Sequence, residues 1–224
     1  MADTEKSILS SHQKNVLEAV SRQTYFTDRY YLAGGTALAG FYLRHRYSED
    51  IDLFIEKEEV DPFAVSGFFK KNAHELKIKS IDTKRFLGLH SFFIQFNDRS
   101  ILKVDFNYYP FPLIERGTRF NGLEIESIYD IAVDKVHTIA LKPRARDYID
   151  IYFILKHKGY HLDKLLLDAK AKFDWDITAL ELAVRLDQAS TMTDYPRMIK
   201  KINHHKWQQF FVDEAKKLKA EIFE

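Results

Sequence analysis

Apolar and polar positions recur with two different periods along the chain, and the helical period dominates its second half. Residues 5–22 repeat apolar side chains at helical spacing, which predicts an amphipathic helix. Residues 30–33 and 51–55 are short runs of the length and composition that strands favour. Two aromatic-rich runs, 86–96 and 101–109, flank the turn sequence Asn-Asp-Arg-Ser and predict a hairpin. The first half of the chain therefore mixes strands with helices.

Two further helices are predicted among these strands, and a series of helices follows them. One covers residues 36–44, and another opens at Asp61 and Pro62, which suit the N-cap and the first helical position. Prolines and glycines over residues 110–122 indicate a connection, and a short strand is expected near 123–127. The rest of the chain is predicted to form helices over 127–141, 144–157, 161–172, 176–189 and 206–222.

This succession predicts an α+β fold in two parts. A mixed α/β sheet domain would occupy residues 1–120, and a helical domain would occupy 121–224. The 224 residues include 18 Phe and 12 Tyr, which is enough apolar material for a sizeable core. A helical interaction domain that merely carries an α/β cap is a less specific alternative.

The composition excludes several classes of function. The chain has no cysteine, so a disulfide scaffold, a thiolate zinc site and a cysteine nucleophile are ruled out. No stretch approaches the roughly 18 apolar residues that a membrane span needs, and the polar N-terminus lacks the pattern of a signal peptide. We therefore expect a cytoplasmic protein with no membrane partner. The net charge of +1 means that nucleic-acid binding would require local basic patches.

One acidic run carries unusual chemistry. Residues 49–61 contain seven acids and one lysine, a pattern that is most often a solvated face. Here, however, Asp50 and Asp52 alternate with strand-forming apolar residues, which places both carboxylates on the same side of a strand. Two crowded negative charges raise a pKa or require a cation, so the run hints at a metal site.

A glycine pair precedes this strand. Gly34, Gly35 and Thr36 lie between a predicted strand and a predicted helix, where backbone N–H groups can approach a bound phosphate. The signal is weak alone, because glycine pairs also make ordinary turns and this one matches neither the P-loop nor the dinucleotide fingerprint.

A third acid completes the candidate site. Asp105 lies among strand-forming residues, an awkward place for a charge unless it points into a site. If its strand lies beside residues 51–55, three carboxylates converge. Such a group can hold two Mg²⁺ ions, which prefer oxygen ligands and stabilise the attacking and leaving oxygens of a displacement at phosphorus.

The order of these motifs resembles the nucleotidyltransferase superfamily related to polymerase β. More narrowly, the sequence is similar to the AbiEii/AbiGii toxin family of nucleotidyltransferases. The similarity rests on four segments in the right order, which are Gly34–Leu38, His45–Phe54, Asp130–Lys135 and Arg146–Asp150.

The resemblance implies a role for each matching residue. Asp50, Asp52 and Asp105 would bind Mg²⁺ or Mn²⁺, and Asp105 would also help to activate the attacking hydroxyl. The phosphates of a nucleoside triphosphate such as ATP would be held at the glycine turn, by Lys135 and near Ser48, and Asp147 would be functional. The nucleotide-binding residues implied are thus Gly34, Gly35, Thr36, Ser48 and Lys135, and the helical domain would contribute Lys135 and Asp147 to the nucleotide cleft.

Ordinary structural roles compete with several of these assignments. Ser48 is also a plausible turn residue. Asp150 could simply pair with Arg146, four residues earlier on the same helix. Lys103 could touch phosphate or be an exposed strand lysine. Aromatic residues near Phe106 could stack on a base, although strand aromatics more often belong to a core.

The sequence as a whole predicts a metal-dependent nucleotidyltransferase that moves a nucleoside monophosphate to an acceptor hydroxyl. The resemblance implies a toxin of a toxin–antitoxin pair, with transfer RNA as a candidate acceptor and a cognate antitoxin as a candidate partner. The basic stretch from Lys135 to Arg146 could bind phosphates of nucleotide or RNA. The alternatives are a transferase that modifies a protein or a small molecule, and a non-catalytic nucleotide-binding module of the same fold.

Overall fold

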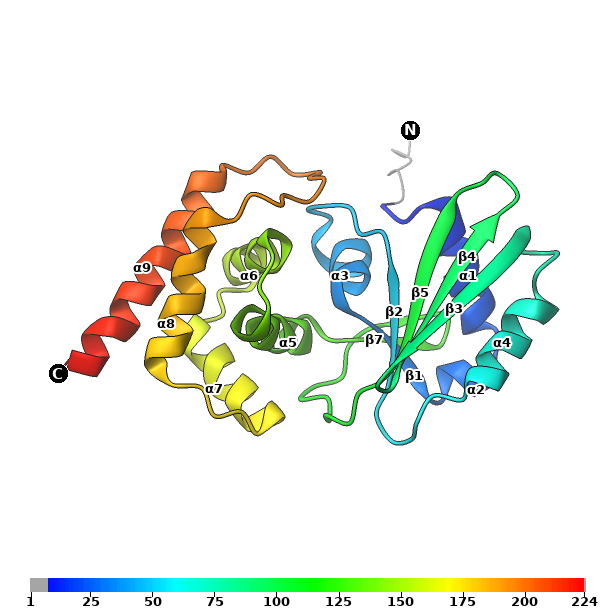
Figure 1. Ribbon diagram of the computed structural model, residues 1–224, viewed down its shortest axis with the longest axis horizontal. Coiled ribbons are helices and arrows are strands. Elements are labelled where there is room, and N and C mark those ends of the chain that lie inside the picture. The colour runs from blue at the N-terminus through cyan, green and yellow to red at the C-terminus, as the bar shows by residue number, and fades with distance from the viewer. Residues whose placement is uncertain (1–7, 224) are drawn as a thin grey trace. The chain divides into compact units, whose positions relative to one another are not determined.

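The first half of the chain folds around a mixed seven-stranded sheet. A computed structural model describes residues 8–223 (Figure 1). The strand order is β3-β4-β5-β2-β1-β7-β6, and the pairs β2–β5 and β1–β7 are parallel whereas the other neighbours are antiparallel. The strands are β1 (Tyr30–Ala33), β2 (Ile51–Ile55), β3 (Ile78–Phe86), β4 (Leu89–Phe96), β5 (Ile101–Tyr108), β6 (Arg119–Phe120) and β7 (Leu123–Ile125).

One face of this sheet forms an aromatic core. Phe106 is fully buried, and its ring centroid lies 5.6 Å from that of Phe92, 5.8 Å from Phe26 and 6.2 Å from Phe69. These rings come from strands and from helices on one side of the sheet, which Figure 1 shows beside the strands. Phe106 is therefore a core packing residue and does not stack on a base. The helices of this unit are α1 (Ser11–Ser21), α2 (Thr24–Thr27), α3 (Gly34–Ala37) and α4 (Pro62–Lys71), and a π-helical turn, Leu38–Leu43, follows α3.

Local signals explain where two of these helices begin. Ser10 and Gln13 form a capping box at the start of α1, whose predicted beginning at residue 5 lies outside the described residues. The Asp61 side chain accepts hydrogen bonds from the backbone N–H groups of Phe63 and Ala64, with Pro62 in the first turn of α4. The sequence prediction for this second helix start is confirmed.

The second half of the chain is helical. Tyr148 packs in its core against Trp207 and Phe211, with ring centroids 6.0 and 5.0 Å away. The last turn of α6 ends at Gly159 in the left-handed conformation, a common helix stop. The helices are α5 (Ile128–Leu141), α6 (Ala145–Lys158), α7 (Leu162–Phe173), α8 (Ala179–Asp187) and α9 (His204–Phe223), and a short 3₁₀ turn, Gln188–Thr191, follows α8 (Figure 1).

Contacts divide the chain into two units at a different place from the expected one. The first unit contains the described residues up to Tyr42 and Tyr47–Ser127, and the second contains Leu43–Arg46 and the chain from Ile128. The division falls after Ser127 rather than after residue 120, because β7 pairs with β1 and extends the sheet. The α+β fold class is confirmed. None of the helices in the described part of the chain is long and apolar enough to cross a membrane.

Candidate active site

Two of the predicted carboxylates lie on neighbouring strands. The parallel pairing of β2 with β5 sets Asp52 directly opposite Asp105. Leu53 and Phe106, the next residues on each strand, are fully buried in the core. Because successive side chains on a strand point to opposite faces, both carboxylates lie on the face away from that core. The strand register thus brings together two residues that are far apart in the sequence.

A lysine ammonium group lies among these acids. Lys103 precedes Asp105 by two residues on β5, and its Nζ lies 2.5 Å from Asp105 Oδ2. Partial burial alone would lower the pKa of Lys103. The hydrogen bond to Asp105 and the negative charges of Asp105, Asp50 and Asp52 outweigh burial and raise that pKa. All three predicted metal-binding carboxylates therefore act electrostatically on one point of the sheet face.

The glycine bend closes against Asp52. Gly34 has a φ of 68°, in the left-handed region, and a Cβ at this position would lie 2.8 Å from Asp52 Oδ2. Only a residue without a Cβ lets the Asp52 carboxylate approach the bend in this way. The hydroxyl of the fully buried Thr36 donates a hydrogen bond to the backbone carbonyl of Asp50. The glycine motif and the acidic strand therefore form one local structure.

A fourth acid belongs to this site, and the sequence analysis did not find it. The carboxylate of Glu126 accepts a hydrogen bond from the Gly34 N–H at 3.2 Å, and its side chain is almost completely buried. Its backbone N–H donates to Leu32, and its carbonyl accepts from the Tyr42 hydroxyl. The signal was available, because Leu123 and Ile125 are core residues and alternation from them places Glu126 on the carboxylate face.

Replacing Gly34 with alanine is expected to disrupt this site. The new Cβ would push against Asp52 Oδ2, and an L-residue in the left-handed region costs about 1–2 kcal/mol. We expect a lower midpoint of thermal unfolding together with at least a tenfold loss of the nucleotide-transfer activity that the sequence predicts. Gly67→Ala is the matched control, because Gly67 is exposed in α4 with nothing near its absent Cβ, and alanine there should be neutral or stabilising. Wild-type activity in Gly34→Ala would contradict the proposed closeness of the bend and Asp52.

The chemical type of the ligands on this face, carboxylate oxygens, suits a divalent cation. Carboxylate oxygens are the ligands that Mg²⁺ and Mn²⁺ prefer. Asp105 Oδ1 is buried and has no hydrogen-bond partner. Within residues 8–223, no three His, Cys, Asp or Glu side chains are grouped closely enough to hold a metal ion as they stand. Asp105 instead gives its second oxygen to Lys103.

The predicted lysine and aspartates of the second half lie in the helical unit. Lys135 on α5 donates to Asp147 Oδ1 at 2.6 Å, and its Nζ lies 3.1 Å from Asp150 Oδ2. Arg144 Nε donates to the other Asp147 oxygen at 3.3 Å. Both aspartates are completely buried, and Lys135 is nearly so. Their charges therefore neutralise one another within the unit, and the role of Lys135 and Asp147 toward nucleotide stays a prediction.

Asp150 anchors the short segment Leu43–Arg46 within this unit. Arg46 donates two hydrogen bonds of 2.7 Å to the two Asp150 oxygens, and His45 Nε2 lies 2.8 Å from Asp150 Oδ1. Burial alone would raise the pKa of Asp150. The charges of Arg46 and Lys135 and these hydrogen bonds reverse that effect and hold the pKa well below its usual range. The alternative of a helical Arg146–Asp150 pair is therefore wrong.

Other residues of the sequence motifs have clear local partners. The backbone carbonyl of Ser48 accepts a hydrogen bond of 2.9 Å from the buried Gln13 side chain on α1, which fixes the entry to β2. The predicted binding of nucleotide by Ser48 stays a prediction. Asp130 and Asp134 on α5 both hold Lys172 Nζ of α7, at 3.1 and 2.8 Å. The second-half motifs thus supply helix-to-helix ion pairs.

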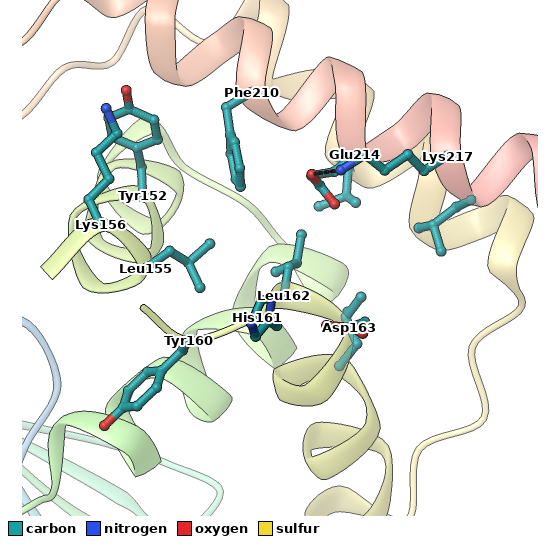
Figure 2. A pocket seen from close by; sticks show the side chains of 13 residues that line it. Tyr152, Leu155, Lys156, Tyr160, His161, Leu162, Asp163, Phe210, Glu214 and Lys217 are labelled. Atoms are coloured by element: carbon teal, nitrogen blue, oxygen red, sulfur yellow. Dashed lines mark hydrogen bonds and ion pairs between the residues drawn. The ribbon is translucent and has the colours of Figure 1, made fainter. Parts of the chain in front are cut away.

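A groove in the helical unit carries none of the predicted site residues. Figure 2 shows it between α6, α7 and α9, with Tyr152 and Phe210 among its walls, and its volume is about 490 Å³. Lys156 lies 4.5 Å from the Tyr152 ring centroid, and Lys217 pairs with Glu214. Two lysines and two acids in the lining balance one another, so its charge selects neither an anion nor a cation.

Comparison with known families decides the assignment. A family model described as "Nucleotidyl transferase AbiEii toxin, Type IV TA system" matches residues 16–217. The chain belongs to the AbiEii family. A protein of Aquifex aeolicus (strain VF5), aq_aa25, is 32% identical to this AbiEii chain over 169 residues, which cover 74% of the chain and 76% of that protein. The resemblance seen in the sequence is thereby confirmed, and the chain is a nucleotidyltransferase of a toxin–antitoxin family.

Solved structures show that the AbiEii chain shares its fold with proteins of Helicobacter pylori. The crystal structure of JHP933 superimposes with a TM-score of 0.57 at 20% identity, covering 97% of this chain and 94% of that one. A second Helicobacter pylori structure gives a TM-score of 0.59 at 19% identity and covers 99% of both chains. These similarities extend over both the sheet and the helices, so the fold includes the helical half.

Proposed function

We propose that this AbiEii enzyme transfers a nucleoside monophosphate from a nucleoside triphosphate to an acceptor hydroxyl, with Mg²⁺ or Mn²⁺ bound by Asp50, Asp52 and Asp105. The observation that carries the proposal is the register of Asp52 with Asp105, beside a glycine bend that admits the Asp52 carboxylate. Bound divalent ions would stabilise the charge that develops on the attacking and leaving oxygens.

The residues of the sheet face suit the chemistry at the α-phosphorus. The acceptor oxygen forms a bond to phosphorus, the bond to the bridging oxygen breaks, and pyrophosphate leaves. Asp105 Oδ1 is buried and accepts no hydrogen bond, and we propose that it takes the acceptor proton or a cation. The backbone N–H groups at Gly35 and Thr36 are the proposed phosphate donors, because the Thr36 hydroxyl already serves the Asp50 carbonyl.

The partners follow from the family. A type IV toxin–antitoxin family implies an antitoxin as well as a nucleoside triphosphate substrate. We propose transfer RNA as the acceptor, and this step rests on the family resemblance. A protein or small-molecule acceptor is the competing possibility.

Labelled triphosphates test this function directly. The purified enzyme is incubated with each of the four α-³²P-labelled ribonucleoside triphosphates, with Mg²⁺ or EDTA, and with separate pools of transfer RNA, protein and small metabolites. We expect label on transfer RNA, pyrophosphate release and complete dependence on the divalent ion. Label only on protein would contradict the RNA acceptor, and equal transfer in EDTA would contradict the metal. The chain heated before incubation serves as the control.

A further inference from the structure

Lys103 is partly exposed, but its ammonium group pairs with a nearly buried carboxylate, which an ordinary surface lysine does not do. Its Nζ lies 2.5 Å from Asp105 Oδ2, and its side chain is 32% exposed whereas that of Asp105 is 8% exposed. Alternation along β5 places Lys103 and Asp105 on the same face, and the register with β2 brings Asp52 beside them. The ammonium group therefore reaches a nearly buried carboxylate from a position that still touches solvent.

A nearby cation offsets the repulsion among the carboxylates of Asp50, Asp52 and Asp105. Like charges held close together on one sheet face repel each other, and burial strengthens that repulsion. Lys103 supplies one positive charge, and it binds one oxygen of Asp105 while the other has no hydrogen-bond partner. A lysine carries its charge on a flexible stem of four carbons, so it can leave the carboxylate without any change in the backbone.

We propose that Lys103 is an internal counter-cation for the carboxylates of Asp50, Asp52 and Asp105. When a divalent cation binds, Lys103 releases Asp105 Oδ2. In the structure, Lys103 holds Asp105 Oδ2, the oxygen that the cation would take. The proposal rests on the carboxylate metal site of the proposed function. It predicts that Lys103 stabilises the protein without metal and competes with the metal for the same oxygen.

Lys103→Met tests this exchange, because it keeps the length of the side chain and removes the charge. Thermal unfolding is measured in EDTA and in saturating MnCl₂, and Mn²⁺ affinity is measured by calorimetry without nucleotide. We expect the variant to unfold about 2–4 °C below wild type in EDTA, with most of this deficit removed by Mn²⁺. We also expect Mn²⁺ to bind at least threefold more tightly, because its competitor is gone.

Two further variants control the experiment. Lys84→Met removes a lysine from the same sheet face, where Lys84 is exposed and lies 5.2 Å from the Phe93 ring centroid, and should behave like wild type in both assays. Lys103→Arg keeps the cation and should bind Mn²⁺ as wild type does. Equal Mn²⁺ affinity in Lys103→Met and wild type, or an equal stability deficit with and without Mn²⁺, would overturn the exchange alone. Wild type binding Mn²⁺ no better than Asp52→Asn would overturn the metal site, and the exchange with it.

Discussion

Replacing Asp52 with asparagine is expected to lower kcat for nucleotide transfer by at least about 10³-fold, while the fold stays intact. Asp52 lies opposite Asp105 and against the Gly34 bend, so its charge acts where the proposed metal and phosphates meet. The same position contributes little to the core, because the adjacent Ile51 and Leu53 are the buried residues of β2. Asp52→Ala should be equally inactive.

The measurement is single-turnover transfer of labelled nucleotide, with thermal unfolding recorded on the same samples. Asp82→Ala is the matched control, because Asp82 is an exposed acid on β3 whose register with Phe93 and Lys103 places it on the same sheet face. Its activity should stay within about twofold of wild type. Full activity in Asp52→Asn would refute the carboxylate mechanism. Loss of activity accompanied by unfolding would show that Asp52 is needed for the fold instead.

Much of the fold could be predicted from local patterns of apolar and polar residues in the sequence. Apolar runs at strand length predicted β1 and β2 with their observed bounds, and helical spacing predicted α5, α6 and α7 to within a residue or two. The edge strand β3 was missed because its side chains are mostly exposed and polar. Such a strand is held by hydrogen bonds to β4 rather than by burial, and no periodicity marks it.

The sequence analysis identified three acids of the candidate site, but it missed the fourth, Glu126, and the ion pair between Lys103 and Asp105. Alternation with apolar residues identified Asp50, Asp52 and Asp105, because a carboxylate in a strand needs a reason to be there. Lys103 and Asp105 lie on the same strand, so their contact depends on β5 alone. Its relation to Asp50 and Asp52 depends on the pairing of β2 with β5. That register is set by the fold as a whole, and so is the approach of Glu126 to Gly34.

Truncating Asp150 to alanine is expected to produce the largest loss of stability, about 3–5 kcal/mol of unfolding free energy in the helical unit. Asp150 is completely buried, and its two oxygens accept from His45, Arg46 and Lys135. Removing the carboxylate leaves the buried cations of Arg46 and Lys135 without this partner. The resulting loss of unfolding free energy is far larger than the net contribution of the intact ion pairs. The segment Leu43–Arg46 would also lose the side-chain anchor that Asp150 provides.

Hydrogen exchange measures this effect where it should occur, because the chain has two units and a single unfolding transition need not describe both. Asp150→Ala should raise exchange rates in α5, α6 and residues 43–46, while the β2 and β5 amides change little. Asp176→Ala, an exposed acid of the same unit, should stay within about 0.5 kcal/mol of wild type. Asp150→Asn, which keeps the shape without the charge, should lie between the two.

Acidification should act in the same direction as the substitution. Because the folded pKa of Asp150 is depressed, its contribution is fully present above the unfolded value near 4 and declines only as pH falls further. The stability difference between wild type and Asp150→Ala should therefore shrink on strong acidification. A difference below about 1 kcal/mol at neutral pH would mean that water or backbone groups replace the lost carboxylate, and that Asp150 is not the anchor of this segment.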